Sequence, residues 1–150
     1  MTKLVPYFLL TTWLLLSSIS QQMPLHAIHS TQMNIQEFDL ELHEWRKGKE
    51  IQLSHPFFAL KSVRAEPDDT IVFQGESGGQ AGTIFLQFYT LSGRLIPVAP
   101  EKHRSVRVDK KKRPFEVASV IPVELRGKRG VVQVTFQGEK RAAFLLSVLF

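Results

Sequence analysis

Apolar and polar side chains alternate along most of the chain, in short runs separated by turn residues. Val132, Val134 and Phe136 alternate with polar residues, and a turn at 137–140 leads into a last apolar run over 142–150. Alternation with a period of two is typical of β-strands that bury one face, and no stretch beyond position 34 keeps a helical period for more than two turns. We count about eight strands, at the spacing expected for an all-β sandwich or barrel.

The pattern also predicts which strands are central. The runs 83–91 and 142–150 are apolar at both parities, so we expect them inside a sheet that is covered on both faces. Prolines in 95–100 and charges in 105–108 are typical of edge strands. The prediction is an all-β domain over 34–150: a two-sheet antiparallel sandwich, immunoglobulin-like, with about seven to eight strands.

The first 20 residues have the layout of a secretory signal peptide. Lys3 precedes an uncharged run over 4–16, and small residues follow up to Ser20, after which we expect cleavage. An uncleaved membrane anchor is the alternative, although the run is shorter than the roughly 20 apolar residues of a spanning helix. Residues 21–33 are interpreted as a linker. The expected location is therefore periplasmic or secreted, with membrane contact only through an uncleaved leader.

Composition narrows the chemistry. The chain of 150 residues has no cysteine, which excludes disulfides, thiolate zinc sites and a cysteine nucleophile. An exported domain without disulfides depends on its hydrophobic core alone, and a chain of this length is long enough to build one.

No motif indicates catalysis. Residues 75–79, Gly-Glu-Ser-Gly-Gly, resemble the nucleophile segment of trypsin-like serine proteases over five positions only, and we interpret 75–82 as a glycine-rich hairpin loop. His26 and His29 have a spacing that can bind metal on a helix, yet they lie in the predicted linker without a third ligand. We therefore expect no enzyme activity, no cofactor and no metal site.

Charge is distributed unevenly. Positions 21–93 hold five Lys and Arg against nine Asp and Glu, whereas positions 94–150 hold thirteen against five. Basic turns can bind an anionic envelope component or an acidic protein surface, or they can simply keep the domain soluble. Nucleic acid is not expected, because export separates the chain from it and no aromatic side chains are interleaved with the basic ones. The candidate binding residues are Lys110, Lys111, Lys112, Arg113, Arg126, Lys128 and Arg129.

Two segments carry a family resemblance. Residues 88–96, Phe-Tyr-Thr-Leu-Ser-Gly-Arg-Leu-Ile, resemble the central strand–turn–strand of small secreted immunoglobulin-like sandwiches, including the sorting domains of type IX secretion cargo. Residues 130–134, Gly138 and the last strand follow in the same order as in those domains. The chain lacks the tyrosine and the strongly basic terminal strand of that family. The resemblance implies a sandwich fold and leaves the activity open, because one fold serves many functions.

These observations predict an exported, non-enzymatic binding or structural accessory protein of the cell envelope, which contacts its partner through loops or a sheet edge. Two alternatives stay open. One is an envelope hydrolase with dispersed catalytic residues. The other is a small outer-membrane β-barrel, although the row opposite its lipid-facing strand residues is not polar as such a barrel requires: it reads Ala143, Leu145, Ser147 and Leu149.

Overall fold

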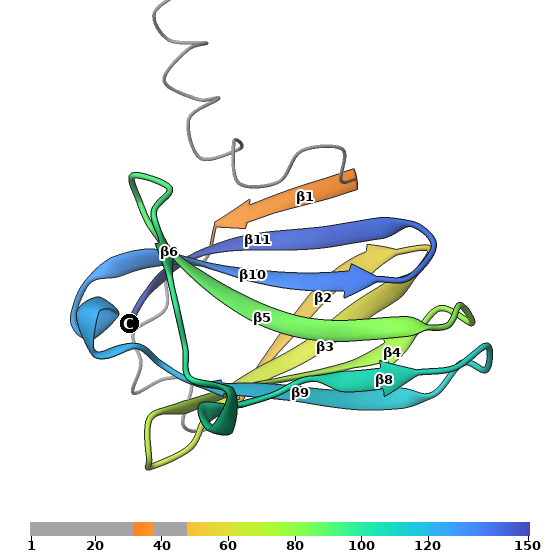
Figure 1. Ribbon diagram of the computed structural model, residues 1–150, viewed down its shortest axis with the longest axis horizontal. Coiled ribbons are helices and arrows are strands. Elements are labelled where there is room, and N and C mark those ends of the chain that lie inside the picture. The colour runs from red at the N-terminus through yellow and green to blue at the C-terminus, as the bar shows by residue number, and fades with distance from the viewer. Residues whose placement is uncertain (1–31, 38–47) are drawn as a thin grey trace, which may run out of the picture.

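The computed structural model describes residues 32–37, as backbone only, and residues 48–150 with their side chains (Figure 1). This part of the chain contains eleven strands and two short 3₁₀ segments, η2 (Pro100–Lys102) and η3 (Val123–Leu125). The strands are β1 (Gln32–Glu37), β2 (Lys49–His55), β3 (Phe58–Ala65), β4 (Thr70–Ser77), β5 (Gly82–Thr90), β6 (Leu95–Ile96), β7 (His103–Arg104), β8 (Val106–Val108), β9 (Pro114–Val120), β10 (Arg129–Gln137) and β11 (Arg141–Leu149).

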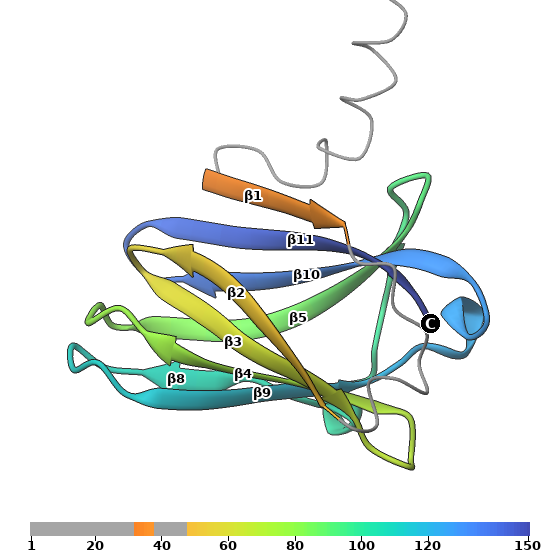
Figure 2. The ribbon, with the colours of Figure 1, turned by 180° about the vertical axis from the view of Figure 1, so that it is seen from behind.

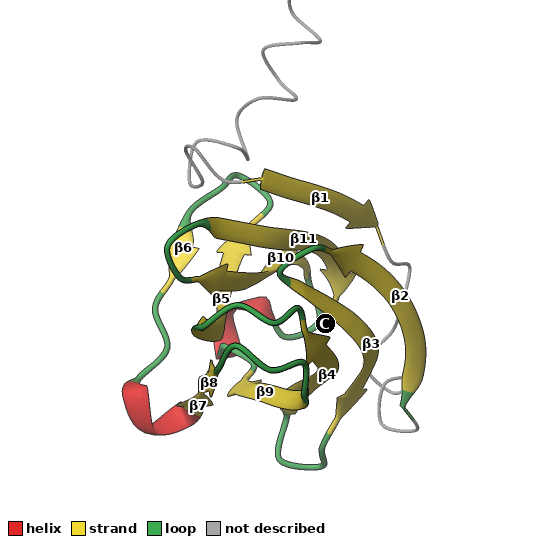
Figure 3. Cartoon of the chain, turned by 90° about the vertical axis from the view of Figure 1, so that its right-hand side faces the viewer, coloured by secondary structure: helices red, strands yellow, loops and turns green. Residues whose placement is uncertain are grey.

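The strands form two sheets that face each other. Sheet A has the order β1-β11-β10-β5-β6, with β8 also paired to β5, and sheet B has the order β2-β3-β4-β9-β7. Every pair is antiparallel except β1 with β11, which run parallel. Figure 3 shows the two layers end-on.

The connectivity is that of an immunoglobulin domain. In chain order, β3 and β4 lie in sheet B, β5 in sheet A, β7 and β9 in sheet B, and β10 and β11 in sheet A. These seven strands take the places of A to G in the constant-type arrangement, whose sheets are ABED and CFG. The prediction of an immunoglobulin-like antiparallel sandwich is therefore confirmed, with β1, β2, β6 and β8 as additions at sheet edges.

The core lies between the sheets and is rich in phenylalanine. Alternate residues of β5, β10 and β11 belong to this core, as the period of two predicts. Phe58 of sheet B is 1% exposed, and its ring lies 4.8 Å from that of Phe144 and 6.2 Å from that of Phe136 in sheet A. Aromatic rings at these separations add to the stabilisation that comes from burying their apolar area. Without disulfides, this contact between layers holds the fold together.

One side of the sandwich is closed by a segment that changes sheets twice. The chain pairs with β5 as β6, then with β9 as β7, and then with β5 again as β8. Val98, Val106 and Val108 of this segment pack against the core. The prediction that 95–100 and 105–108 lie at edges is confirmed.

The outer face of sheet A is partly buried, so the prediction that the runs 83–91 and 142–150 are covered on both faces holds at some positions only: Leu145 is buried there, whereas Phe85 and Leu149 are half-buried. β5 lies between β10 and the short strands β6 and β8, and β11 lies between β10 and β1. On the side away from the core, Leu145 is 5% exposed and Gln133 and Thr135 are fully buried. The Gln133 side chain donates a hydrogen bond of 2.8 Å to the Thr135 hydroxyl, which partly offsets the cost of burying its amide.

Two predictions about the strands were wrong. The described residues contain eleven strands rather than seven or eight, because β6, β7 and β8 have only two or three residues each and β1 begins inside the predicted linker. Glycine did not end β4 at position 75. A Cβ on Gly75 would meet the Phe115 ring and the Ala59 carbonyl, so glycine at this position allows both groups to approach the β4 backbone closely. Because β4 continues to Ser77, the loop that follows it covers only 78–81.

The predicted signal peptide 1–20 and nearly all of the predicted linker 21–33 lie outside the described residues. Within the described part of the chain, no helix is long and apolar enough to cross a membrane.

Candidate functional site

The candidate basic residues fall at opposite ends of the sandwich. Antiparallel pairing places the loops 78–81, 109–113 and 138–140 at one end, beside the turn between β2 and β3 (Figure 1). We call this the basic end, and we call residues 109–113 the basic loop. The loops 66–69, 91–94 and 121–128 lie at the other end, which we call the opposite end. Lys110 to Arg113 therefore cannot share one binding surface with Arg126, Lys128 and Arg129.

A buried serine fixes the basic loop. Ser77, at the end of β4, is 2% exposed, and its hydroxyl donates to the Lys111 carbonyl at 3.1 Å and accepts from the Arg113 N–H at 3.0 Å. The Ser77 N–H also donates to the Arg113 carbonyl at 2.9 Å. Within the loop, Asp109 Oδ1 accepts the Lys111 N–H at 2.8 Å. Four hydrogen bonds thus hold the loop backbone, and its lysines project from a fixed frame.

The three lysines of the loop add positive charge to this end of the sandwich. Lys110, Lys111 and Lys112 are exposed, and none of the ion pairs within residues 48–150 involves them. Arg113 differs, because it lies 3.5 Å from Asp109. The loops of the basic end hold five basic and two acidic residues, so the end carries a net positive charge.

The opposite end is organised differently. Arg126 pairs with Asp69 at 3.5 Å and Arg94 pairs with Glu124 at 3.1 Å. The Gly127 N–H donates to the Phe150 carbonyl at 2.7 Å, so this segment is tied to the residue that follows β11. The loops of this end hold three basic and four acidic residues, and their charge is close to balanced.

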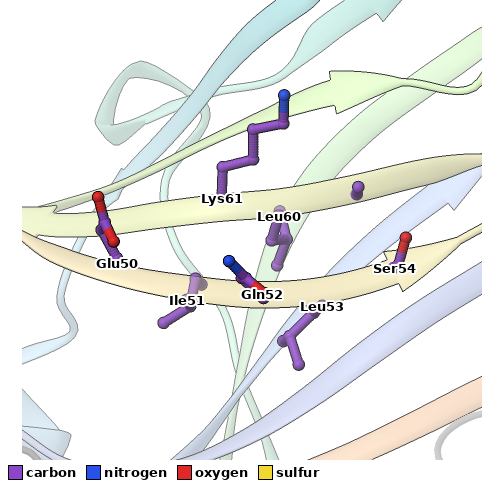
Figure 4. A pocket seen from close by; sticks show the side chains of 8 residues that line it. Glu50, Ile51, Gln52, Leu53, Ser54, Leu60 and Lys61 are labelled. Atoms are coloured by element: carbon purple, nitrogen blue, oxygen red, sulfur yellow. The ribbon is translucent and has the colours of Figure 1, made fainter.

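The outer face of sheet B is hollowed beside the basic end. A hollow of about 510 Å³ lies over β2 and β3, and a second one of about 250 Å³ continues from it to the basic loop. Figure 4 shows the first hollow, where Lys61 and Ser54 point away from the side that Ile51 and Leu53 occupy. Ser54, Ala59 and Lys61 line both hollows. The basic loop therefore borders a concave polar surface.

Two titratable groups in the second hollow are perturbed. The Lys61 ammonium donates to Glu76 at 2.8 Å and holds the pKa of that carboxyl below its usual range, with a smaller contribution from Lys112. Partial burial lowers the pKa of His55, whose Nδ1 accepts the Phe57 N–H at 3.1 Å. The hollow thus brings two lysine side chains, the Glu76 carboxyl and the His55 imidazole to one surface.

Comparisons with known proteins add no assignment. No protein-family model matches the chain, and neither a curated protein nor a solved structure was found to be similar to it. Within the described residues, no group of three or more His, Asp or Glu side chains could hold a metal ion. The function must therefore be argued from the site itself.

Several residues of this surface were missed from the sequence. Ser77 was assigned to a glycine-rich loop, yet it ends a strand and anchors the basic loop from 34 positions away. Lys61 and Ser54 are single polar residues in alternating runs, so nothing in their spacing distinguishes them from any solvent-facing strand position. Only the pairing of β2, β3 and β4 places them beside the basic loop.

Proposed function

We propose that the protein is an exported, non-enzymatic binding or structural accessory protein of the cell envelope, whose basic end contacts an anionic envelope component or an acidic protein surface. The observation that carries this proposal is the basic loop. It presents three lysines, which make no ion pair within residues 48–150, on a backbone that Ser77 fixes by hydrogen bonds. A fixed loop loses little conformational entropy on binding, so more of its electrostatic attraction appears as affinity.

The place of the loop in the fold supports the same proposal. In the immunoglobulin arrangement, 78–81 is the B–C loop, 109–113 the D–E loop and 138–140 the F–G loop. The B–C and F–G loops belong to the end that variable domains use for recognition, where a rigid sandwich positions loops of variable sequence. The resemblance of 88–96 to secreted immunoglobulin-like domains points in the same direction. The cellular location in the proposal rests on the sequence of residues 1–20 alone.

The test removes the three lysines and compares the result with an equal loss of charge elsewhere. The variant Lys110→Ser/Lys111→Ser/Lys112→Ser is measured against Lys49→Ser/Lys102→Ser/Lys128→Ser, which removes three exposed lysines outside the basic loop. Binding to vesicles that contain phosphatidylglycerol is measured by co-sedimentation, and retention on isolated envelopes by fractionation. At about 1 kcal/mol for each lysine that lies near an anionic surface, the loop variant should bind roughly 100-fold more weakly.

The control variant should lose much less, because its lysines do not lie together. Equal losses in the two variants would mean that net charge alone drives binding, and the basic loop would then have no special role. Unchanged binding in the loop variant would remove the basic end from the account altogether.

A further inference from the structure

The second hollow has a defined floor and a cationic rim. Ala59 and Gly78 line it where larger side chains would fill it, and its volume is about 250 Å³. Lys112 reaches it from the basic loop, while Lys61 comes from β3 and Ser54 from β2. Three separate segments of the chain therefore bring two ammonium groups and a hydroxyl to one concave surface.

The close approach of two turns shapes the floor. The Gly78 N–H donates to the Phe57 carbonyl at 2.7 Å, which ties the loop 78–81 to the turn between β2 and β3. A Cβ on Gly78 would lie 2.7 Å from the Phe57 carbonyl carbon and would also meet the Pro56 carbonyl. Only glycine allows this contact without a shift of the backbone, so the hollow is part of the sandwich frame rather than an accident of side-chain positions.

A β-bulge directs Lys61 toward the hollow. The register of β3 shifts on the side of β2 between Glu50 and Leu53, and on the side of β4 between Leu60 and Ser62. Lys61 therefore has no register partner on β4 and is the extra residue of that pairing. Bulges re-aim side chains and are common beside functional sites.

The charges around the hollow favour an anion. Glu76 balances one of the two ammonium groups through its 2.8 Å contact with Lys61, and the Lys112 ammonium remains in excess. A phosphate monoester carries a charge of about −1.5 to −2 at neutral pH and has three strong acceptor oxygens. Lysine binds phosphate as a compact point charge, without the fixed planar geometry that arginine requires.

We propose that this hollow binds the phosphate monoester group of a small ligand, with Lys61 and Lys112 as its cations and Ser54 as a hydroxyl donor. The proposal names a ligand class for the basic end and therefore rests on the proposed function. The volume is below the roughly 300 to 1,000 Å³ of sites that enclose a whole drug-sized molecule, so the hollow accommodates the phosphate and about one attached glycerol or sugar unit. Such a group is found on soluble glycerol or sugar phosphates and on phosphatidic acid.

The first experiment is an NMR titration of the ¹⁵N-labelled full chain with glycerol 3-phosphate at constant ionic strength. We expect saturable shifts of the Ser54, Lys61 and Gly78 amides and of the His55 ring, because all four residues line the hollow. Lys112→Ser should raise the dissociation constant about tenfold, as expected for the loss of one charge-assisted hydrogen bond. Lys102→Ser removes the same charge from an exposed lysine that lies outside the basic loop and does not line the hollow, and it should change the constant less than about twofold.

A second pair of variants separates shape from charge. Ala59→Leu fills the floor without altering any charge and should abolish the saturable shifts, whereas Ala81→Leu, on an exposed position outside the hollow, should leave them intact. Shifts that never saturate, or equal weakening by Lys102→Ser and Lys112→Ser, would overturn the proposal. That result could coexist with specific loss of envelope retention in the triple-lysine variant, so the proposed function and this inference fail separately.

The last arm distinguishes the two sources of the phosphate. Vesicles with phosphatidic acid present a monoester, and vesicles with phosphatidylglycerol at equal charge present a diester. Tighter binding to phosphatidic acid, reduced by Ala59→Leu, would indicate a lipid headgroup as the ligand. Saturable binding of glycerol 3-phosphate without this lipid preference would indicate a soluble phosphate ester. If neither the preference for phosphatidic acid nor saturable binding of glycerol 3-phosphate were observed, the proposal would be overturned.

Discussion

The two ends of the sandwich carry similar basic runs in the sequence and different surfaces in the structure. At the basic end, Lys110, Lys111 and Lys112 project from a loop that Ser77 holds, and they make no ion pair within the described residues. At the opposite end, acidic residues from other loops pair with Arg94 and Arg126.

The opposite end also differs in its apolar surface. The three large apolar side chains that are exposed in the described residues, Leu91, Leu95 and Val123, lie at or beside this end. A run of basic residues therefore becomes a charged surface only where the fold brings no acidic loop against it. The comparison predicts that substitutions at the basic end disturb both the packing of its turns and its charged surface, and that equivalent substitutions at the opposite end have smaller effects.

The largest expected difference concerns two glycines. Gly78→Ala places a Cβ against the backbone of the turn between β2 and β3, and we expect it to lower the free energy of unfolding by about 2–3 kcal/mol. Gly127→Ala puts a Cβ into open space, so its cost is only the positive φ of +72°, about 1 kcal/mol. Urea unfolding of the two variants measures the difference. If Gly78→Ala proved the milder change, the two turns at the basic end would not be in firm contact.

A smaller difference is expected for two serines. Ser77→Ala leaves the Arg113 N–H and the Lys111 carbonyl without their buried partner and should cost about 1–2 kcal/mol. Ser92→Ala removes an exposed hydroxyl, 2.8 Å from that of Thr90, and should cost less than about 0.5 kcal/mol. Amide hydrogen exchange gives a second measurement, because the Arg113 N–H should exchange faster in Ser77→Ala only. Unchanged protection of that amide would show that the serine does not fix the basic loop.

The smallest effect concerns pH. The pKa of Glu76 is lowered mainly by its contact with Lys61, so its carboxylate stabilises the fold above the pKa that it has in the unfolded chain. This contribution is lost as the pH falls through the lowered pKa of the folded state. A ¹³C titration of the Glu76 carboxyl should place its midpoint below that of an ordinary glutamate, and Lys61→Met should move the midpoint upward. A midpoint that Lys61→Met does not move would mean that the ion pair is not formed in solution.

The fold was predictable because its main determinants are local. The period of two in β10, the double-sided apolar runs of β5 and β11, and the prolines of 95–100 each specify a strand and its place in a sheet. These features depend on residues that are close in sequence. The short strands β6, β7 and β8 could not be predicted as individual strands, since a run of two or three residues shows no periodicity.

The site was less accessible from the sequence because it depends on pairing between distant segments. Lys110 to Arg113 are conspicuous as a run, but Ser77 becomes their anchor only when β4 and β9 pair. Gly75 appears in the sequence as part of a loop, and only the Ala59 carbonyl and the Phe115 ring packed against it explain why a strand needs glycine there. The bulge at Lys61 likewise arises from the registers of three strands.

The position of β11 has a consequence for how the polypeptide acquires its structure. This strand is the last one along the chain, yet it pairs on one side with β10 and on the other with β1, more than 100 positions earlier. Sheet A therefore cannot be completed until residues 141–149 have left the ribosome. Topologies dominated by such long-range contacts fold over milliseconds to seconds, which leaves an interval in which the apolar faces of the earlier strands are still uncovered.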